Sequence, residues 1–253
     1  SKSVAIGQQA LHIQNFTSST DSHNIAIGYQ TGRLITTGIQ NTLVGGLAGD
    51  ALIAAADNVA VGFEALSTET GGQNNVAVGP RALKAQVNSS GNIYNVAVGS
   101  NAGTAVTTGN FNTLIGGLAG TAMTTGAGNT AVGIQAMGGG VVTGGSNTVI
   151  GSAAGFALTS GGNNLCLGKD SGRTGSPGGN LTAQNNQIVI GDENITNIYA
   201  QVDISPASDQ RDKTDFTALD LGLDFVKALA PVTYKWDKRS KYGDKTADGY
   251  DLN

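Results

Sequence analysis

Side chains that could do chemistry are few in the first two hundred residues of this 253-residue chain. The one cysteine, Cys166, has no second cysteine for a disulfide, and His12 and His23 have no partner at metal-ligand spacing. Glycine-rich turns such as residues 138–140 lack the Lys-Ser/Thr pair of a phosphate-binding loop. Carboxylates are few and scattered, so glycan hydrolysis is not expected here. We therefore expect no metal ion, cofactor or catalytic centre in residues 1–200.

The composition indicates a repeat architecture that ends in a different kind of segment. Glycine accounts for 39 of 253 residues, about twice the usual frequency, and charged residues make up only 13%. The formal net charge of -4 gives no support for nucleic-acid binding. No run reaches the roughly 18 apolar residues that span a membrane, so membrane insertion is not expected. Residues 1–200 carry 14 charged side chains and residues 201–253 carry 18, which predicts a boundary near residue 200.

A short motif, Asn-x-apolar-apolar-Gly, recurs eleven times when two variants that begin with Ser3 and Gln187 are included. The basic period is 17 residues, and longer spacings reflect local insertions. Such a period is the sequence signature of a stacked repeat. The copies are residues 3–7, 24–28, 41–45, 58–62, 75–79, 95–99, 112–116, 129–133, 147–151, 164–168 and 187–191.

Each copy predicts a short strand that is apolar on both faces, because alternate side chains of a strand point to opposite sides. We therefore expect both faces to be buried. An Ala-Leu or Ala-Gly pair that begins three residues after the glycine predicts a second short strand. Seventeen residues leave no room for a helical crossover, so the fold class is all-β, a parallel β-roll or solenoid of about 11 rungs over residues 1–193.

The invariant residues of the motif have structural explanations. The glycine suits a corner that needs positive φ or close backbone approach, and the asparagine can hydrogen-bond its own turn or stack on its neighbour. One apolar strand face fills the thin interior of the coil, so the opposite face must be covered, most simply by another copy of the chain. The pattern alone does not distinguish a dimer from a trimer.

The repeat resembles the head domains of trimeric autotransporter adhesins and similar repeats in phage tail fibres. The residues that carry the resemblance are Asn-Val-Ala-Val-Gly at 58–62, 75–79 and 95–99, and Ser-Val-Ala-Ile-Gly at 3–7. This resemblance implies a left-handed β-roll and a homotrimer packed around a common axis.

The charged end of the chain predicts a small α+β segment. Residues 194–208 are interpreted as a connector that contains one last strand or an extended stretch. Residues 209–253 contain an amphipathic run that ends before Pro231, which suits a helix, and then a strand over residues 232–236.

The motif Ser208-Asp209-x-Arg211-x-Lys213, with the Pro-Val-x-Tyr-x-Trp strand after it, resembles the start of the intramolecular chaperone domain of phage tailspikes and fibres. That resemblance implies trimer assembly and self-cleavage between Ser208 and Asp209, with Ser208 as the nucleophile and Lys213 as the general base, a serine-lysine pair. The alternative is that the motif only starts the fold, since Asp212 would tend to keep Lys213 protonated.

Together these features predict a trimeric tail fibre or tailspike of a bacteriophage virion. Its expected partners are its own copies, other virion tail proteins and a host cell-surface receptor, either a glycan or an outer-membrane component. The longer insertions at residues 12–23, 84–94 and 171–186 are the candidate receptor loops. The alternative is a trimeric autotransporter-type adhesin on a bacterial surface, which the motif at Ser208 disfavours. An ice-binding solenoid would need a regular threonine array that the sequence lacks.

Overall fold

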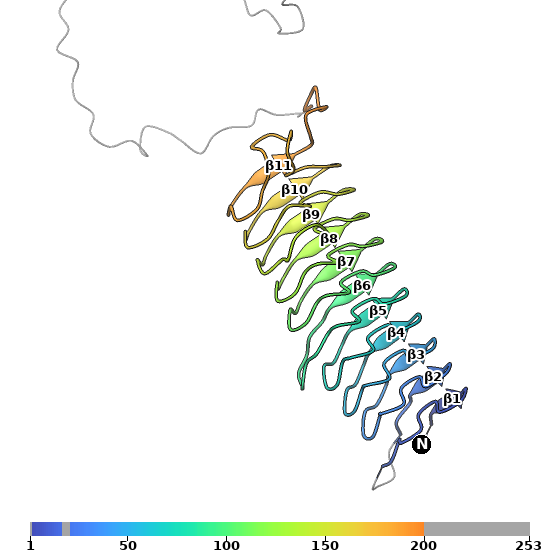
Figure 1. Ribbon diagram of the computed structural model, residues 1–253. Helices are drawn as coiled ribbons and strands as arrows, with labels where there is room; N and C mark the ends of the chain where they lie inside the picture. Colours follow the sequence, from blue (N-terminus) through green and yellow to red (C-terminus); the bar gives the residue numbers. More distant parts are fainter. Residues whose placement is uncertain (1, 17–20, 200–253) are drawn as a thin grey trace, which may run out of the picture. The chain divides into compact units, whose positions relative to one another are not determined.

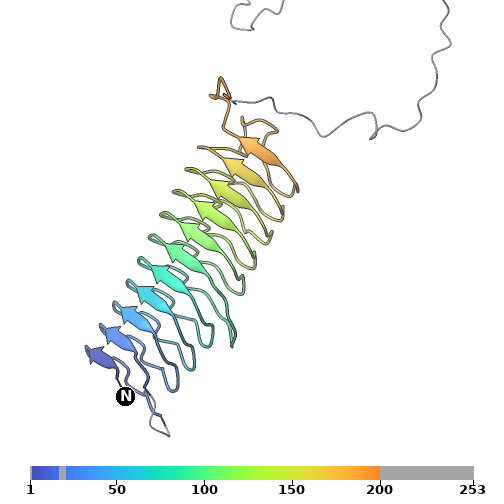
Figure 2. The same cartoon turned by 180° about the vertical axis from the view of Figure 1, so that it is seen from behind.

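The computed structural model describes residues 2–16 and 21–199, which form an elongated coil with one strand per repeat (Figures 1 and 2). All eleven strands belong to one sheet, and their order in the sheet is their order in the chain. Each strand has three residues. They are β1 (Val4–Ile6), β2 (Ile25–Ile27), β3 (Thr42–Val44), β4 (Val59–Val61), β5 (Val76–Val78), β6 (Val96–Val98), β7 (Thr113–Ile115), β8 (Thr130–Val132), β9 (Thr148–Ile150), β10 (Leu165–Leu167) and β11 (Ile188–Ile190).

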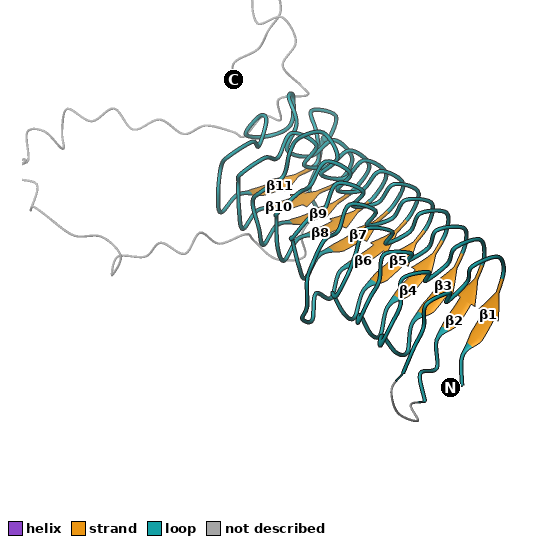
Figure 3. Cartoon of the chain, turned by 60° about the horizontal axis from the view of Figure 1, so that its bottom comes forward, coloured by secondary structure: helices purple, strands orange, loops and turns teal. Residues whose placement is uncertain are grey.

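Neighbouring strands are parallel, and equivalent residues of successive repeats lie side by side. Ala60 of β4 is paired with Ala77 of β5, and the N–H of Val59 donates to the carbonyl of Asn75 at 2.8 Å. Loops make up the rest of each turn, and the described residues contain no helix (Figure 3). The predicted all-β parallel solenoid with eleven strands is confirmed.

The prediction of a second short strand in each repeat is wrong, because each repeat contains only one strand. After β1 to β10 the segment that follows the glycine is a turn, because left-handed residues on both sides of its central residue prevent an extended backbone. That central residue is alanine in eight of the ten repeats. Around Ala119, Leu118 has φ 61° and Gly120 has φ 57°. The turns still hydrogen-bond between rungs: the N–H of Gly120 donates to the carbonyl of Ala136 at 2.8 Å.

In most repeats the thin core is filled by one large and one small residue, one from the strand and the other from the turn. The central side chain of each strand from β2 to β10 is almost wholly buried. In the repeat of β5 that residue is Ala77, and the turn supplies Leu83; in the repeat of β7 it is Leu114, and the turn supplies Gly120. A Cβ on Gly120 would lie 2.9 Å from a methyl carbon of Leu114, so two large side chains do not fit there.

The glycine that ends each strand is required by close backbone approach. Gly116 has φ 129°, and a Cβ on it would lie 2.5 Å from the carbonyl oxygen of Gly133 in the next rung. Any side chain here would push neighbouring rungs apart at the point where the chain leaves the sheet. This explains the one invariant position of the motif.

A ladder of buried asparagines runs along the interior beside the strands. The side-chain oxygen of Asn112 accepts hydrogen bonds from the backbone N–H and side-chain amide of Asn129, at 3.0 and 3.3 Å. The side-chain nitrogen of Asn112 donates to the oxygen of Asn95 and to the carbonyl of Gly126. From Asn24 to Asn164 these residues are almost completely buried. Each amide therefore satisfies backbone groups that would otherwise be unpaired in the interior.

The ladder changes partners where residues 84–94 lengthen a repeat. The side-chain amide of Asn95 donates to Gln86 at 2.9 Å instead of to the preceding asparagine, and Gln86 donates to Glu69 at 2.8 Å. One carboxyl oxygen of Glu69 accepts hydrogen bonds from four backbone N–H groups, those of residues 70, 71, 72 and 88. The other also accepts from the side chain of Asn88. Glu69 therefore ties Gln86 and Asn88 of the inserted segment to the turn at residues 70–72 inside the coil.

Replacing Asn112 with alanine should lower the free energy of unfolding by about 2–4 kcal/mol, because buried groups of Gly126 and Asn129 lose their partner. The measurement is a denaturant midpoint at fixed chain concentration. Ser100→Ala, which changes an exposed hydroxyl, is the control and should cost less than about 0.5 kcal/mol. Equal midpoints for the two variants would contradict the ladder's structural role.

Replacing Glu69 with glutamine should destabilise the segment 84–94, because an NH₂ group would then face donors that the carboxyl oxygen accepts from. Limited proteolysis should cut this segment faster in Glu69→Gln than in the unmodified chain. Glu64→Gln is the matched control, since Glu64 bonds only to the exposed or half-exposed side chains of Arg81 and Lys84. Unchanged cleavage in both variants would show that Glu69 does not hold the segment.

Candidate functional site

The outer face of the sheet is a continuous apolar surface that one chain leaves uncovered. In each strand the central residue points into the core and its two neighbours point outward. These outward positions hold only Val, Ile, Leu and Thr in all eleven strands. The most exposed are Ile188 at 72%, Ile6 at 57% and Val4 at 45%.

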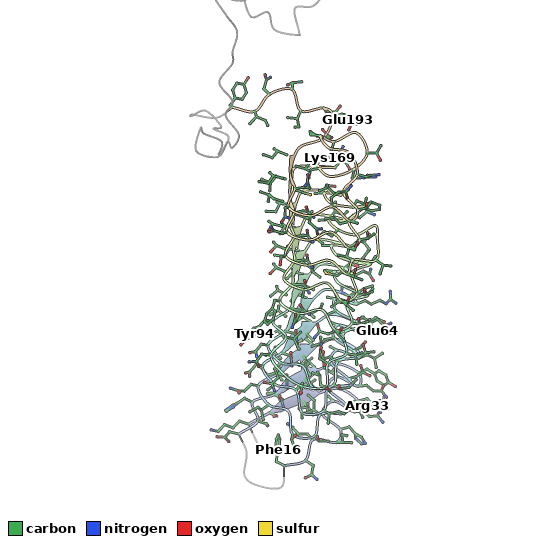
Figure 4. All side chains as sticks on the ribbon, turned by 90° about the vertical axis from the view of Figure 1, so that its left-hand side faces the viewer. Phe16, Arg33, Glu64, Tyr94, Lys169 and Glu193 are labelled. Carbon is green, nitrogen blue, oxygen red and sulfur yellow. The ribbon has the colours of Figure 1, made fainter. Side chains whose placement is uncertain are left out.

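A single chain buries one face of its strands, as the thin interior predicts, and the expected cover over the other face, another copy of the chain, stays a prediction. The coil is too thin to fold over its own sheet, so only the inner face lies in the core (Figure 3). Figure 4 shows the strands along one side of the coil, with the loops on the other. Monomeric proteins seldom expose a contiguous apolar face, and this one runs along all eleven strands.

Aromatic side chains extend the apolar surface around the edge of the sheet. Tyr94 and Phe111, each just before a ladder asparagine, stack with ring centroids 6.0 Å apart and are 49% and 56% exposed. Both have left-handed backbones, with φ 55° and 58°, at a repeat position that elsewhere mostly holds polar residues. Bulky residues seldom adopt this conformation. On the edge after the strands, Tyr29, Phe63 and Ile134 are also about half exposed.

The three candidate receptor loops differ in how firmly the structure holds them. Residues 84–94 are tied to the core by Glu69, as described above. In 171–186 the side chain of Leu181 is buried, and its N–H donates to the carbonyl of Gly172 at 2.9 Å. Of the segment 12–23, residues 17–20 lie outside the described part.

The other residues singled out from the sequence have simple environments. Cys166 is buried in the centre of β10, as predicted for a small core residue, and burial raises the pKa of its thiol to about 11. His12 and His23 are exposed, and the described residues hold no cluster of three metal-ligating side chains. Over the same residues, no helix has the length and apolar character needed to cross a membrane.

Ser208 and Lys213 lie outside the described residues, as does the whole predicted α+β segment from 209 to 253. Of the predicted connector, residues 194–199 are described, and none of them is in a strand. The chain divides between residues 198 and 199 into two units, of which the first contains the solenoid. The proposed roles of Ser208 and Lys213 therefore rest on the sequence.

Comparison with known families identifies this charged end. Residues 208–250 match the family described as the chaperone of endosialidase, and the match begins at Ser208. No curated protein and no solved structure matches the chain. The chain thus combines a parallel β-solenoid with a C-terminal segment that matches the chaperone of endosialidase, an arrangement typical of phage tail fibres and tailspikes.

Proposed function

We propose that this chain forms a homotrimeric fibre of a bacteriophage virion that attaches to the host cell. In this proposal three left-handed coils pack with the outer faces of their sheets toward a common axis. The observation that carries it is the uncharged apolar face running along all eleven strands. A second supporting fact is the match of residues 208–250 to the chaperone of endosialidase.

The distribution of polar groups fits an assembly around the sheet. Figure 4 labels Tyr94 on the side of the strands, and Arg33, Glu64 and Glu193 on the side of the loops. The side chains of Arg33, Glu64 and Glu193 are therefore available to face water when the strands face one another. A closed threefold arrangement covers the apolar face of each copy with equivalent faces of the other two. A bacterial surface adhesin would use the same packing, and the segment from Ser208 favours the virion fibre.

The proposal gives residues 209–253 the role of a trimerisation segment joined to the solenoid by residues 194–208. Self-cleavage would hydrolyse the amide between Ser208 and Asp209. One water is consumed, Ser208 gains a free carboxyl group and Asp209 gains a free amine. The hydroxyl of Ser208 attacks the carbonyl carbon of this amide, and a neutral Lys213 accepts the hydroxyl proton and passes it to the departing amine of Asp209. The water then hydrolyses the ester that has formed. Other virion tail proteins and a host receptor are the further partners, and no cofactor is required.

A charged substitution on the outer face should weaken the trimer and leave the single coil folded. We expect the uncleaved Ser208→Ala protein to have three times the 25.4 kDa chain mass, about 76 kDa, in native mass spectrometry. Adding Ile150→Lys should shift it toward monomer, because β9 then carries a buried charge at the interface. Thr121→Lys is the control, since Lys84 occupies the same repeat position in another rung. A monomeric parent, or a trimer that tolerates Ile150→Lys, would contradict the proposal.

Self-cleavage predicts a fragment that ends at Ser208 in intact-mass measurements of the purified chain. Ser208→Ala and Lys213→Met should both remove that fragment, because each lacks one partner of the serine-lysine pair. A third variant, Asp212→Asn, should keep or increase cleavage, since it removes a negative charge that favours the protonated form of Lys213. A trimer that stays intact at Ser208 would show that the motif only starts the fold.

A further inference from the structure

The end of the solenoid carries a cavity that the trimer face does not use. Its volume is about 400 Å³, and it lies between the turn after β9, the inserted loop after β10 and the segment after β11. Phe156, Arg173, Asn180 and Glu193 are among the residues that line it. A volume of this size is at the lower end of the range for small-molecule sites.

The inserted loop that forms one wall is closed on itself. The hydroxyl of Ser176 donates to the carbonyl of Arg173 at 2.7 Å, and the N–H of Leu181 returns to the carbonyl of Gly172 at 2.9 Å. Because Leu181 is buried in the core, the loop has a fixed base. The cavity wall is thus anchored at both ends.

Charged residues gather around this cavity. No charged residue occurs between Lys84 and Lys169, and five then occur within residues 169–193. The guanidinium of Arg173 lies 4.9 Å from the ring centroid of Phe156 and bonds to Asp170 at 2.6 Å. The ammonium of Lys169 and the guanidinium hold the pKa of Asp170 below its usual range. The rungs between residues 85 and 168 form without charges, so these side chains are not needed for stacking.

Several polar side chains at the cavity are exposed, so they can exchange bonds to water for bonds to a ligand. Among the described residues, none donates to the Glu193 carboxylate or bonds to the side chains of Thr174 and Asn180. The guanidinium of Arg173 uses one of its five N–H donors on a side chain, that of Asp170. By contrast, Glu64 in the other charged cluster bonds to both neighbouring cations. The cavity therefore offers donors and acceptors side by side.

This mixture selects the class of ligand. Asp170 and Glu193 would repel a phosphate or sulfate, and Arg173 would repel a metal cation. A neutral molecule with many hydroxyl groups can accept from the guanidinium and the amide and donate to the carboxylates. We propose that this cavity binds a neutral saccharide of one or two rings through Arg173, Asn180 and Glu193. Glu193 lies on the loop side of the coil in Figure 4, so packing of the strand faces leaves the site open.

The test is saturation-transfer NMR on the full-length Ser208→Ala protein with lactose, maltose, cellobiose and chitobiose as probes. We expect at least one disaccharide to bind, and the double variant Glu193→Gln/Asn180→Ala to weaken binding about tenfold or more, since two hydrogen-bonding groups change. Glu64→Gln is the control and should bind as the parent does. Glucuronate and inorganic phosphate should bind more weakly than the neutral probe.

Three results would overturn the inference: no disaccharide binds, the double variant binds as well as its parent, or phosphate or glucuronate binds more tightly. Only the biological role of this site rests on the proposed attachment function. Adsorption of labelled protein to a panel of bacterial strains separates the two claims. Saccharide binding without adsorption would support the site and contradict attachment, whereas adsorption that the double variant does not reduce would support attachment and contradict the site.

Discussion

The stacked asparagine side chains are the interaction on which the rest of the structure depends. A coil whose strands have only three residues has few ladder hydrogen bonds per turn. Each buried asparagine accepts from the backbone of the next rung and donates to a loop carbonyl, so the turn before the strand is fixed in the same place each time. Because unpaired polar groups inside a protein are costly, this ladder sets the register of the whole coil.

That fixed register explains both the core and the exposed surface. Equivalent residues stack, so a glycine in the turn of one rung makes room for a large strand residue, as Gly120 does for Leu114. The same stacking places the outward residues of every strand in one apolar face. The stacking that makes a single coil regular therefore also leaves one apolar face of its sheet exposed. This exposed face is the physical basis for the proposed trimer.

Much of the fold followed from the sequence because the motif encodes it directly. The position of every strand, the parallel order and the burial of Cys166 were predicted from the period and the alternation of side chains. The second strand was predicted wrongly, because left-handed backbones at residues such as Leu118 leave no mark in an apolar pattern. Leucine seldom adopts that conformation alone, and here the neighbouring rungs impose it.

The candidate sites were less predictable, since they depend on residues brought together from separate rungs. Glu69 could have been noticed as an acidic residue two positions before a pair of glycines, yet its link to Asn88 needs the folded loop. The cavity at the end of the coil is lined by residues between 156 and 193, and no local sequence pattern predicts it. The roles of Ser208 and Lys213 were inferred from a motif alone, and the family match begins at that serine.

A structure of the full-length Ser208→Ala protein by cryo-electron microscopy tests the central claim most directly. The account predicts three chains around one axis, with the outward side chains of β1 to β11, Ile150 among them, within about 4.5 Å of side chains from the other copies. Coils whose strand faces point to solvent, or a different number of chains around the axis, would contradict it.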